Sequence, residues 1–207
     1  MRRGRPGWSL LLACALPFAM AGCLGSSRPS RFYTLAPLEI RDSPASSATG
    51  ATLEVGPVEI PDYVDRQQIV TRTGANELVM AEYDRWGGSL EGEIRRALVA
   101  TVADRLASRN VLVAPWRSLT LAPGAAGYRA AISISRFDGV LGQSVVLHGR
   151  WELMTEKGGK ADMLAAREVT VTEKIDGADY EALVAAMQRA LVRFGREMAD
   201  GIGAIAP

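Results

Sequence analysis

The chain alternates between stretches with a two-residue hydrophobic period and stretches with a helical period. Apolar residues three and four positions apart predict two amphipathic helices, from about residue 90 to 109 and from 180 to about 202, with Ser89 and Asp179 as N-caps. This order predicts an α+β fold, a mostly antiparallel sheet with two amphipathic helices packed on one face. Alternation and short apolar runs predict strands over residues 31–37, 52–60, 69–73, 77–83, 111–114, 128–137, 144–155 and 164–174.

One predicted strand contains an irregularity. Between Val55 and Val58 the apolar positions change phase by one residue, at Gly56-Pro57. A one-residue slip would turn the later side chains to the wrong face of the sheet, so we predict a β-bulge at this dipeptide.

The first 22 residues have the order of a secretory signal peptide. Three arginines precede an apolar stretch over residues 8–21, which is shorter than the roughly 20 residues that a bilayer-spanning helix needs. The next residues, Met20-Ala21-Gly22-Cys23, resemble the bacterial lipobox. The resemblance implies that Cys23 is joined to diacylglycerol, that the preceding bond is cut, and that the new amino terminus is acylated. An ordinary cleavage site beside an incidental cysteine is the alternative.

Residues 23–30 are predicted to be a lipidated cysteine and a flexible tether. The seven residues after Cys23 reach at most roughly 25 Å, which keeps the folded part near the bilayer. Leu24 stands where the sorting rule of enteric lipoproteins places Asp for retention, so we expect the inner leaflet of the outer membrane, facing the periplasm. Inner-membrane sorting stays open, because the rule differs among lineages. Residues 31–207 are expected to form a single α+β domain.

Composition removes several classes of function. The 24 Lys and Arg against 23 Asp and Glu give no basic footprint, so no nucleic-acid partner is expected. One histidine and two cysteines leave no material for a zinc site or a disulfide framework. No metal is expected, and the only attached groups expected are the diacylglycerol and N-acyl chain on Cys23.

Candidate catalytic groups are few, and we predict that the protein is not an enzyme. A Ser-His-acid arrangement would need His148, but no G-x-S-x-G motif exists, and Ser144, four positions earlier on a strand, lies roughly 13 Å away. A hydrolase that uses a carboxylate or His148 stays an alternative. The predicted strands 69–73 and 77–83 are expected to form a hairpin around Gly74-Ala75-Asn76. The carboxylates near this hairpin are expected to form salt bridges with Arg66, Arg72 and Arg85; they are Asp62, Asp65, Glu77, Glu82 and Asp84.

Residues 58–86 are unusually rich in polar and aromatic side chains for a plain hairpin. Here, and at Arg31-Phe32-Tyr33-Thr34-Leu35, the chain resembles the family of ABC-type transport auxiliary lipoproteins, the lipoprotein components of MCE-type lipid transport systems. Gly87-Gly88 departs from the family, which has helix-favouring residues after the tryptophan. The other residues that carry the resemblance are Val55-Gly56-Pro57-Val58, Ile60-Pro61, Tyr63, Asp65-Arg66, Gln68 to Arg72, Trp86 and Leu90.

The resemblance implies a non-enzymatic accessory lipoprotein. It implies an MCE-domain membrane protein as partner, with this chain docking the tip of the partner's tunnel at outer-membrane lipid. A ring-shaped homo-oligomer would suit such a tunnel geometrically. The alternative is a lipoprotein that itself carries phospholipid in an apolar cavity between sheet and helices. The residues expected to form the partner-binding surface or its scaffold are Pro61, Tyr63, Asp65, Arg66, Gln68, Arg72 and Trp86; Pro61, Tyr63 and Trp86 would equally serve to fold the hairpin onto the first helix.

Overall fold

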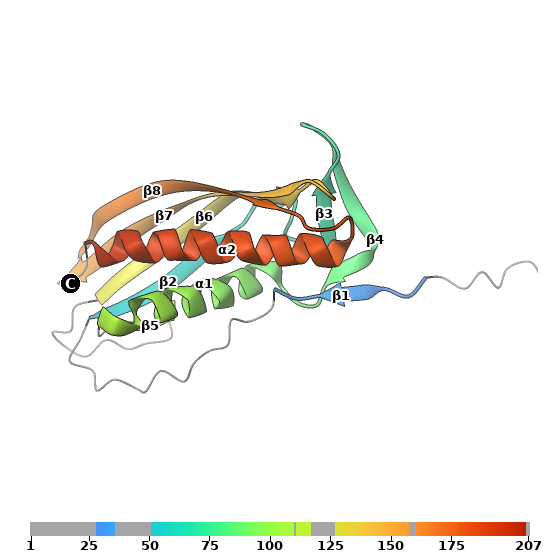
Figure 1. Ribbon diagram of the computed structural model, residues 1–207. Helices are drawn as coiled ribbons and strands as arrows, with labels where there is room; N and C mark the ends of the chain where they lie inside the picture. Colours follow the sequence, from blue (N-terminus) through green and yellow to red (C-terminus); the bar gives the residue numbers. More distant parts are fainter. Residues whose placement is uncertain (1–27, 36–50, 110, 117–126, 158–159, 206–207) are drawn as a thin grey trace, which may run out of the picture.

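The computed structural model describes residues 28–35, 51–109, 111–116, 127–157 and 160–205 (Figure 1). The predicted signal peptide and Cys23 lie outside the described residues. Within the described ranges, no helix has both the length and the hydropathy that crossing a bilayer requires.

The described elements follow the predicted order, with two helices, eight strands and one short 3-10 turn. Their bounds are β1 (Arg31–Tyr33), β2 (Thr52–Glu59), β3 (Gln68–Arg72), β4 (Leu78–Trp86), α1 (Leu90–Leu106), η2 (Ala107–Arg109), β5 (Leu112–Pro115), β6 (Gly127–Gly139), β7 (Ser144–Lys157), β8 (Lys160–Lys174) and α2 (Tyr180–Gly203).

The strands form two mixed sheets. The larger sheet has the order β5-β2-β6-β7-β8, in which β2 runs parallel to β5 and β6 while β6, β7 and β8 are antiparallel. The smaller sheet has the order β1-β4-β3, with β1 parallel and β3 antiparallel to β4. Both helices lie side by side on one face of the larger sheet (Figure 1). The α+β class is therefore confirmed. The sheets are mixed, because β2 and β1 form parallel pairings that the prediction of a mostly antiparallel sheet did not include.

The main core lies between α2 and the long strands of the larger sheet. The apolar stripe of α2, which includes Leu183, Leu191 and Phe194, is fully buried. Gly149 of β7 lets the Phe194 ring approach the strand, because a Cβ there would lie 3.2 Å from the ring. Small residues at such contacts bring the helix close to the sheet, so side chains fill the layer between them.

The predicted irregularity in β2 is confirmed. The pairing of β2 with β6 shifts register between Val55 and Val58, and the Gly56-Pro57 peptide bond is cis. Gly56 has a φ of +123°, a conformation that favours glycine. The shift keeps both Val55 and Val58 buried, as the phase change in the sequence requires.

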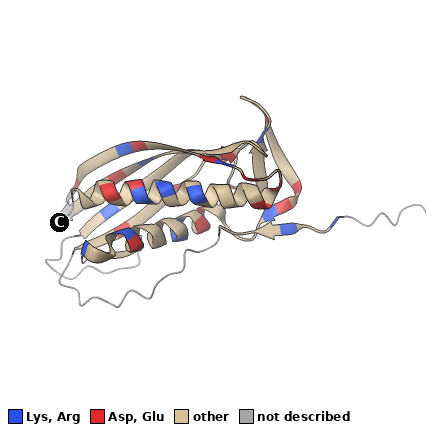
Figure 2. Ribbon diagram, in the orientation of Figure 1, with Lys and Arg blue, Asp and Glu red and all other residues tan. Residues whose placement is uncertain are grey.

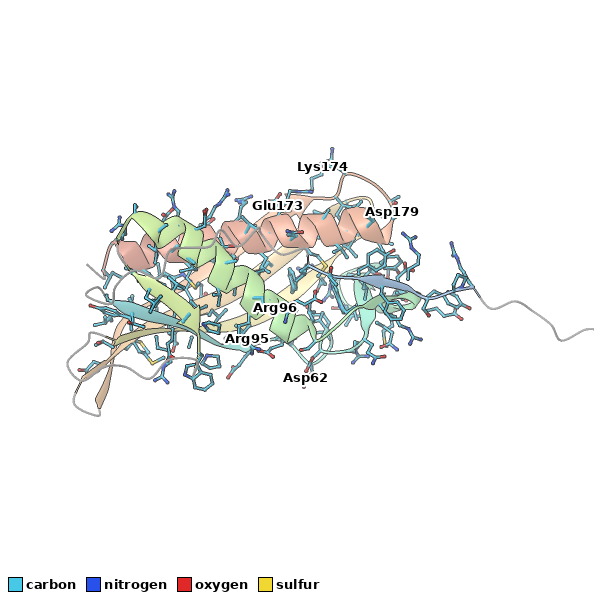
Figure 3. All side chains as sticks on the ribbon, turned by 90° about the horizontal axis from the view of Figure 1, so that it is seen from below. Asp62, Arg95, Arg96, Glu173, Lys174 and Asp179 are labelled. Atoms are coloured by element: carbon cyan, nitrogen blue, oxygen red, sulfur yellow. The ribbon has the colours of Figure 1, made fainter. Side chains whose placement is uncertain are left out.

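The smaller sheet stands at one end of the molecule. β1, β3 and β4 gather where α2 begins, and the carboxyl end of α2 lies at the opposite end (Figure 1). Figure 3 shows the same polarity from below, with Asp179 marking the start of α2 at the end where β1 lies. This arrangement places the residues of the predicted motif at the end of the molecule where the described chain begins.

Candidate functional site

Two of the seven predicted residues, Tyr63 and Arg72, meet at a buried carboxylate that the sequence prediction did not single out. Asp138, near the end of β6, is fully buried. The Tyr63 hydroxyl donates to its Oδ2 at 2.7 Å. Arg72, at the end of β3, donates from Nε to Oδ1 at 3.2 Å and from Nη2 to Oδ2 at 3.0 Å. Arg136 donates from Nε and Nη2 to Oδ1 at 3.1 and 3.0 Å. We call these four residues the Asp138 cluster.

The electrostatics of the Asp138 cluster favour a charged carboxylate. Burial acts to raise the pKa of Asp138, but hydrogen bonds from Arg72, Tyr63 and Arg136 outweigh it and hold the pKa below its ordinary value. Burial and the bond to Asp138 raise the pKa of the Tyr63 phenol. The cluster therefore carries two guanidinium charges against one carboxylate and joins the smaller sheet to β6 of the larger one.

The predicted salt bridges near the hairpin are wrong for the arginines named. Arg72 pairs with Asp138, 66 positions away, while Arg66 donates to the sulfur of Met80 at 2.9 Å. The Nε of Arg85 is buried and has no hydrogen-bond partner among the described residues. Sequence proximity suggested nearby carboxylates, whereas the fold brings β3 against the end of β6.

A change in the alternation of apolar residues along β6 could have indicated from the sequence that Asp138 is buried. Apolar residues alternate through Ile134 and resume at Phe137, and the structure shows a register shift between Ile134 and Arg136. After the shift, Phe137 and Gly139 share one face of the strand, and Gly139 approaches Leu183 of α2. Asp138 consequently points to the opposite face, toward the turn that carries Tyr63.

Pro61 and Trp86 are parts of the scaffold around this end. The Pro61 carbonyl accepts from the amides of Val64 and Asp65 at 3.0 and 3.2 Å and so closes the turn after β2. Trp86 is 4% exposed, and its amide donates to the carbonyl of Gln67 at 2.7 Å. Both residues therefore contribute to folding the turn and the hairpin.

Asp65 and Arg66 are the exposed members of the predicted set. Asp65 makes no side-chain hydrogen bond or ion pair with another described residue, and Arg66 contacts only the sulfur of Met80. Gln68 is half-buried and lies opposite Arg85 in the pairing of β3 with β4. Of the seven residues, Asp65 and Arg66 are the best placed to contact a partner.

β1 is fixed to the smaller sheet and to α1 by polar contacts. The Tyr33 hydroxyl donates to Asp84 at 2.8 Å, and burial together with that bond raises the pKa of Tyr33 to about 12. The amide of Leu35 donates to the buried carboxylate of Glu93 at 2.7 Å. A Cβ at Gly87 would lie 3.1 Å from the Thr34 side chain and 3.4 Å from the Tyr33 carbonyl oxygen, so glycine at this position permits a close approach to the end of β1.

His148 does not form the catalytic arrangement considered from the sequence. Its Nδ1 lies 2.7 Å from the Thr170 hydroxyl of β8, and Ser144 pairs with Lys174, four positions along the same strand. No described carboxylate bonds to the imidazole. In the part of the chain that the structure describes, no group of three or more His, Cys, Asp or Glu residues is arranged to hold a metal ion.

Charges on the helices are mixed. On α2, basic residues gather along the middle of the helix and acidic residues lie toward its two ends (Figure 2); the basic residues are Arg189, Arg193 and Arg196. Arg189 and Arg193 of α2 donate to the carbonyls of Lys174 and Thr172 at the outer edge of β8, at 2.7 and 3.5 Å. These arginines cover an edge strand and so limit its pairing with another chain.

Comparisons with known proteins extend over most of the chain. A family model described as the ABC-type transport auxiliary lipoprotein component matches residues 33–199. The intermembrane transport lipoprotein PqiC of Escherichia coli (strain K12) is 25% identical over 134 residues, which cover 65% of this chain and 68% of PqiC.

Two solved structures share the fold. An uncharacterized protein aligns with a TM-score of 0.66 at 21% identity, covering 84% of this chain and 99% of its own. A protein from Xanthomonas campestris aligns with a TM-score of 0.62 at 19% identity, covering 82% of this chain and 93% of its own. At these identities the likeness concerns the arrangement of helices and strands.

Proposed function

The chain belongs to the family of ABC-type transport auxiliary lipoprotein components, and from this premise we propose that it is a periplasm-facing accessory lipoprotein of an MCE-type lipid transport system. It is anchored through Cys23 in the inner leaflet of the outer membrane and docks the tunnel of an MCE-domain membrane protein there. The family match is the observation that carries this proposal. The relation to PqiC, an intermembrane transport lipoprotein, supports it.

The mechanism we propose is positional. Seven residues separate Cys23 from Arg31, the first residue of β1, so the acyl anchor keeps the smaller sheet, and with it the exposed pair Asp65 and Arg66, near the bilayer. Tethering raises the effective concentration of a weak docking surface relative to its partner. A docked tunnel end would shield lipid tails, whose exposure to water costs about 0.8 kcal/mol per methylene. The Asp138 cluster would act as the scaffold behind this surface.

A non-enzymatic role agrees with the surroundings of His148. Its imidazole bonds to the Thr170 hydroxyl, and no carboxylate of the described residues hydrogen-bonds to the ring to complete a Ser-His-acid arrangement. Under this proposal, His148→Ala leaves the envelope barrier intact, whereas Cys23→Ala weakens it.

Co-purification from the native envelope tests the proposal. The full-length lipoprotein is captured beside a Cys23→Ala variant, and proteins and lipids are identified by mass spectrometry. We expect an MCE-domain protein with the first and a strong reduction with the second. Arg66→Glu should reduce recovery, and Arg167→Glu, an exposed arginine on β8, is the matched control. Phospholipid without an MCE-domain protein would favour the lipid-carrier alternative, and turnover that depends on His148 would favour the hydrolase.

A further inference from the structure

Exposed apolar side chains of this molecule gather at its two ends. Phe32 of β1 is 66% exposed and Met80 of β4 is 55% exposed, and both belong to the smaller sheet. β8 begins at the opposite end (Figure 1), and Met163, near its start, is 58% exposed. Isolated apolar residues on a surface are ordinary, so position decides whether any of them has a function.

Phe32 lies on the outward face of the smaller sheet. In the parallel pairing of β1 with β4, Tyr33 lies opposite the buried Trp86, and Phe32 lies opposite Arg85. Because successive strand residues point to opposite faces, Phe32 points away from the side on which Trp86 is buried. The contacts of Tyr33 and Leu35 with Asp84 and Glu93 hold the strand, so Phe32 is presented from a fixed backbone.

The length of chain before β1 indicates what covers Phe32. Phe32 is nine positions after Cys23, and a tether of this length spans at most about 30 Å when extended. A lipidated Cys23 therefore keeps Phe32 within about 30 Å of the bilayer, and in this respect the inference rests on the proposed function. Arg31, next to Phe32, has a half-exposed guanidinium that lies over the Tyr33 ring at 5.3 Å. Arg31 and Tyr33 therefore share the face opposite Phe32, and the exposed Phe32 ring is the side chain suited to the boundary between headgroups and acyl chains.

We propose that the outward face of the smaller sheet contacts a phospholipid surface and that Phe32 is the side chain that enters it. The contact orients the molecule, with the long strands leading away from the bilayer. β7 has 14 residues and runs from the end that carries the smaller sheet to the other end. Met163 lies opposite Met154, ten positions after the first residue of β7, so at about 3.3 Å per residue it lies roughly 33 Å farther from the lipid.

Site-specific fluorescence quenching tests this contact. A mature chain whose Cys23 is acylated has no other cysteine, so Phe32→Cys supplies one free thiol for an environment-sensitive label. Met163→Cys is the matched control, because that side chain is similarly exposed at the opposite end. The lipidated proteins are placed in vesicles of phosphatidylethanolamine and phosphatidylglycerol, with and without a phosphatidylcholine that carries a nitroxide on its acyl chain.

We expect at least about two-fold more quenching at position 32 than at position 163, because insertion brings a side chain about 5–10 Å into the headgroup boundary. Equal quenching at the two positions, or none at position 32, would overturn the proposal. A blue shift at position 32 that grows with protein concentration before vesicles are added would show that a second copy covers this face, which also overturns it. Mass spectrometry of the amino-terminal peptide reports lipidation separately, so failure of the anchor is distinguished from failure of the contact.

Discussion

The Tyr63 hydroxyl lies 2.7 Å from Oδ2 of Asp138, although 75 positions separate the two residues in the chain. The same hydroxyl accepts a hydrogen bond from the Phe137 amide at 3.3 Å. The Tyr63 phenol thus donates to a buried carboxylate and accepts from a backbone amide, and these two hydrogen bonds connect the turn after β2 to the end of β6.

Tyr63→Phe should destabilise the protein by about 1–3 kcal/mol, because the buried carboxylate loses a donor and the amide loses an acceptor. Urea unfolding followed by circular dichroism measures the difference. Tyr83→Phe is the control, since the Tyr83 hydroxyl bonds only to neighbouring Glu82 on the surface. Equal free energies of unfolding for both variants would show that the phenol contributes nothing to the Asp138 cluster.

Asp138→Asn should destabilise the protein at neutral pH by about 1–3 kcal/mol, because the variant removes the charge that the half-buried Arg72 and the more exposed Arg136 pair with. It should also flatten the acid limb of the stability curve. The pKa of Asp138 is lowered in the native state, so the unfolded chain binds the proton more readily and stability is lost as the pH falls from about 5 through the native pKa. Urea unfolding at a series of pH values checks this, and parallel curves for both proteins would contradict it.

The helices, their N-caps and most of the strands could be predicted from the local pattern of hydrophobic and polar residues. Both N-caps are confirmed: Ser89 accepts from the Gly92 amide at 3.3 Å, and Asp179 accepts from the Ala182 amide at 2.9 Å. These features depend on residues within one turn of a helix. Strand partners depend on distant residues, which explains why the parallel pairing of β2 with β5 and β6 was not placed.

In the candidate site too, local features could be predicted from the sequence and long-range partners could not. Tyr63, Arg72 and Trp86 were identified as motif residues, but their partners were not. Arg72 bonds to Asp138 rather than to a carboxylate of its own hairpin, because the fold, not chain proximity, sets that distance. Exposure, which separates Asp65 and Arg66 from the scaffold residues, likewise emerges only when both sheets are assembled.

Glu93→Ala should destabilise the protein by about 1–3 kcal/mol. Its buried carboxylate accepts from the Leu35 amide at 2.7 Å and holds the chain after β1 to the first turn of α1. Glu93→Gln keeps an acceptor oxygen of the same reach, so it should cost less than Glu93→Ala. Thermal unfolding ranks the variants, and amide exchange at Leu35 should rise most in Glu93→Ala. Indistinguishable variants would mean that this hydrogen bond does not hold the segment.

Gly201→Ala should lower stability by about 1–3 kcal/mol although alanine is the better helix former, because a Cβ at Gly201 would lie 2.6 Å from Cζ2 of the fully buried Trp151. Gly92 of α1 provides the contrast. A Cβ there meets nothing closer than 3.6 Å, so Gly92→Ala should gain about 0.5–1 kcal/mol from helix propensity. Urea unfolding of both variants measures whether each substitution lowers or raises the free energy of unfolding. A stabilising effect of Gly201→Ala would contradict the close contact between α2 and the Trp151 ring of β7.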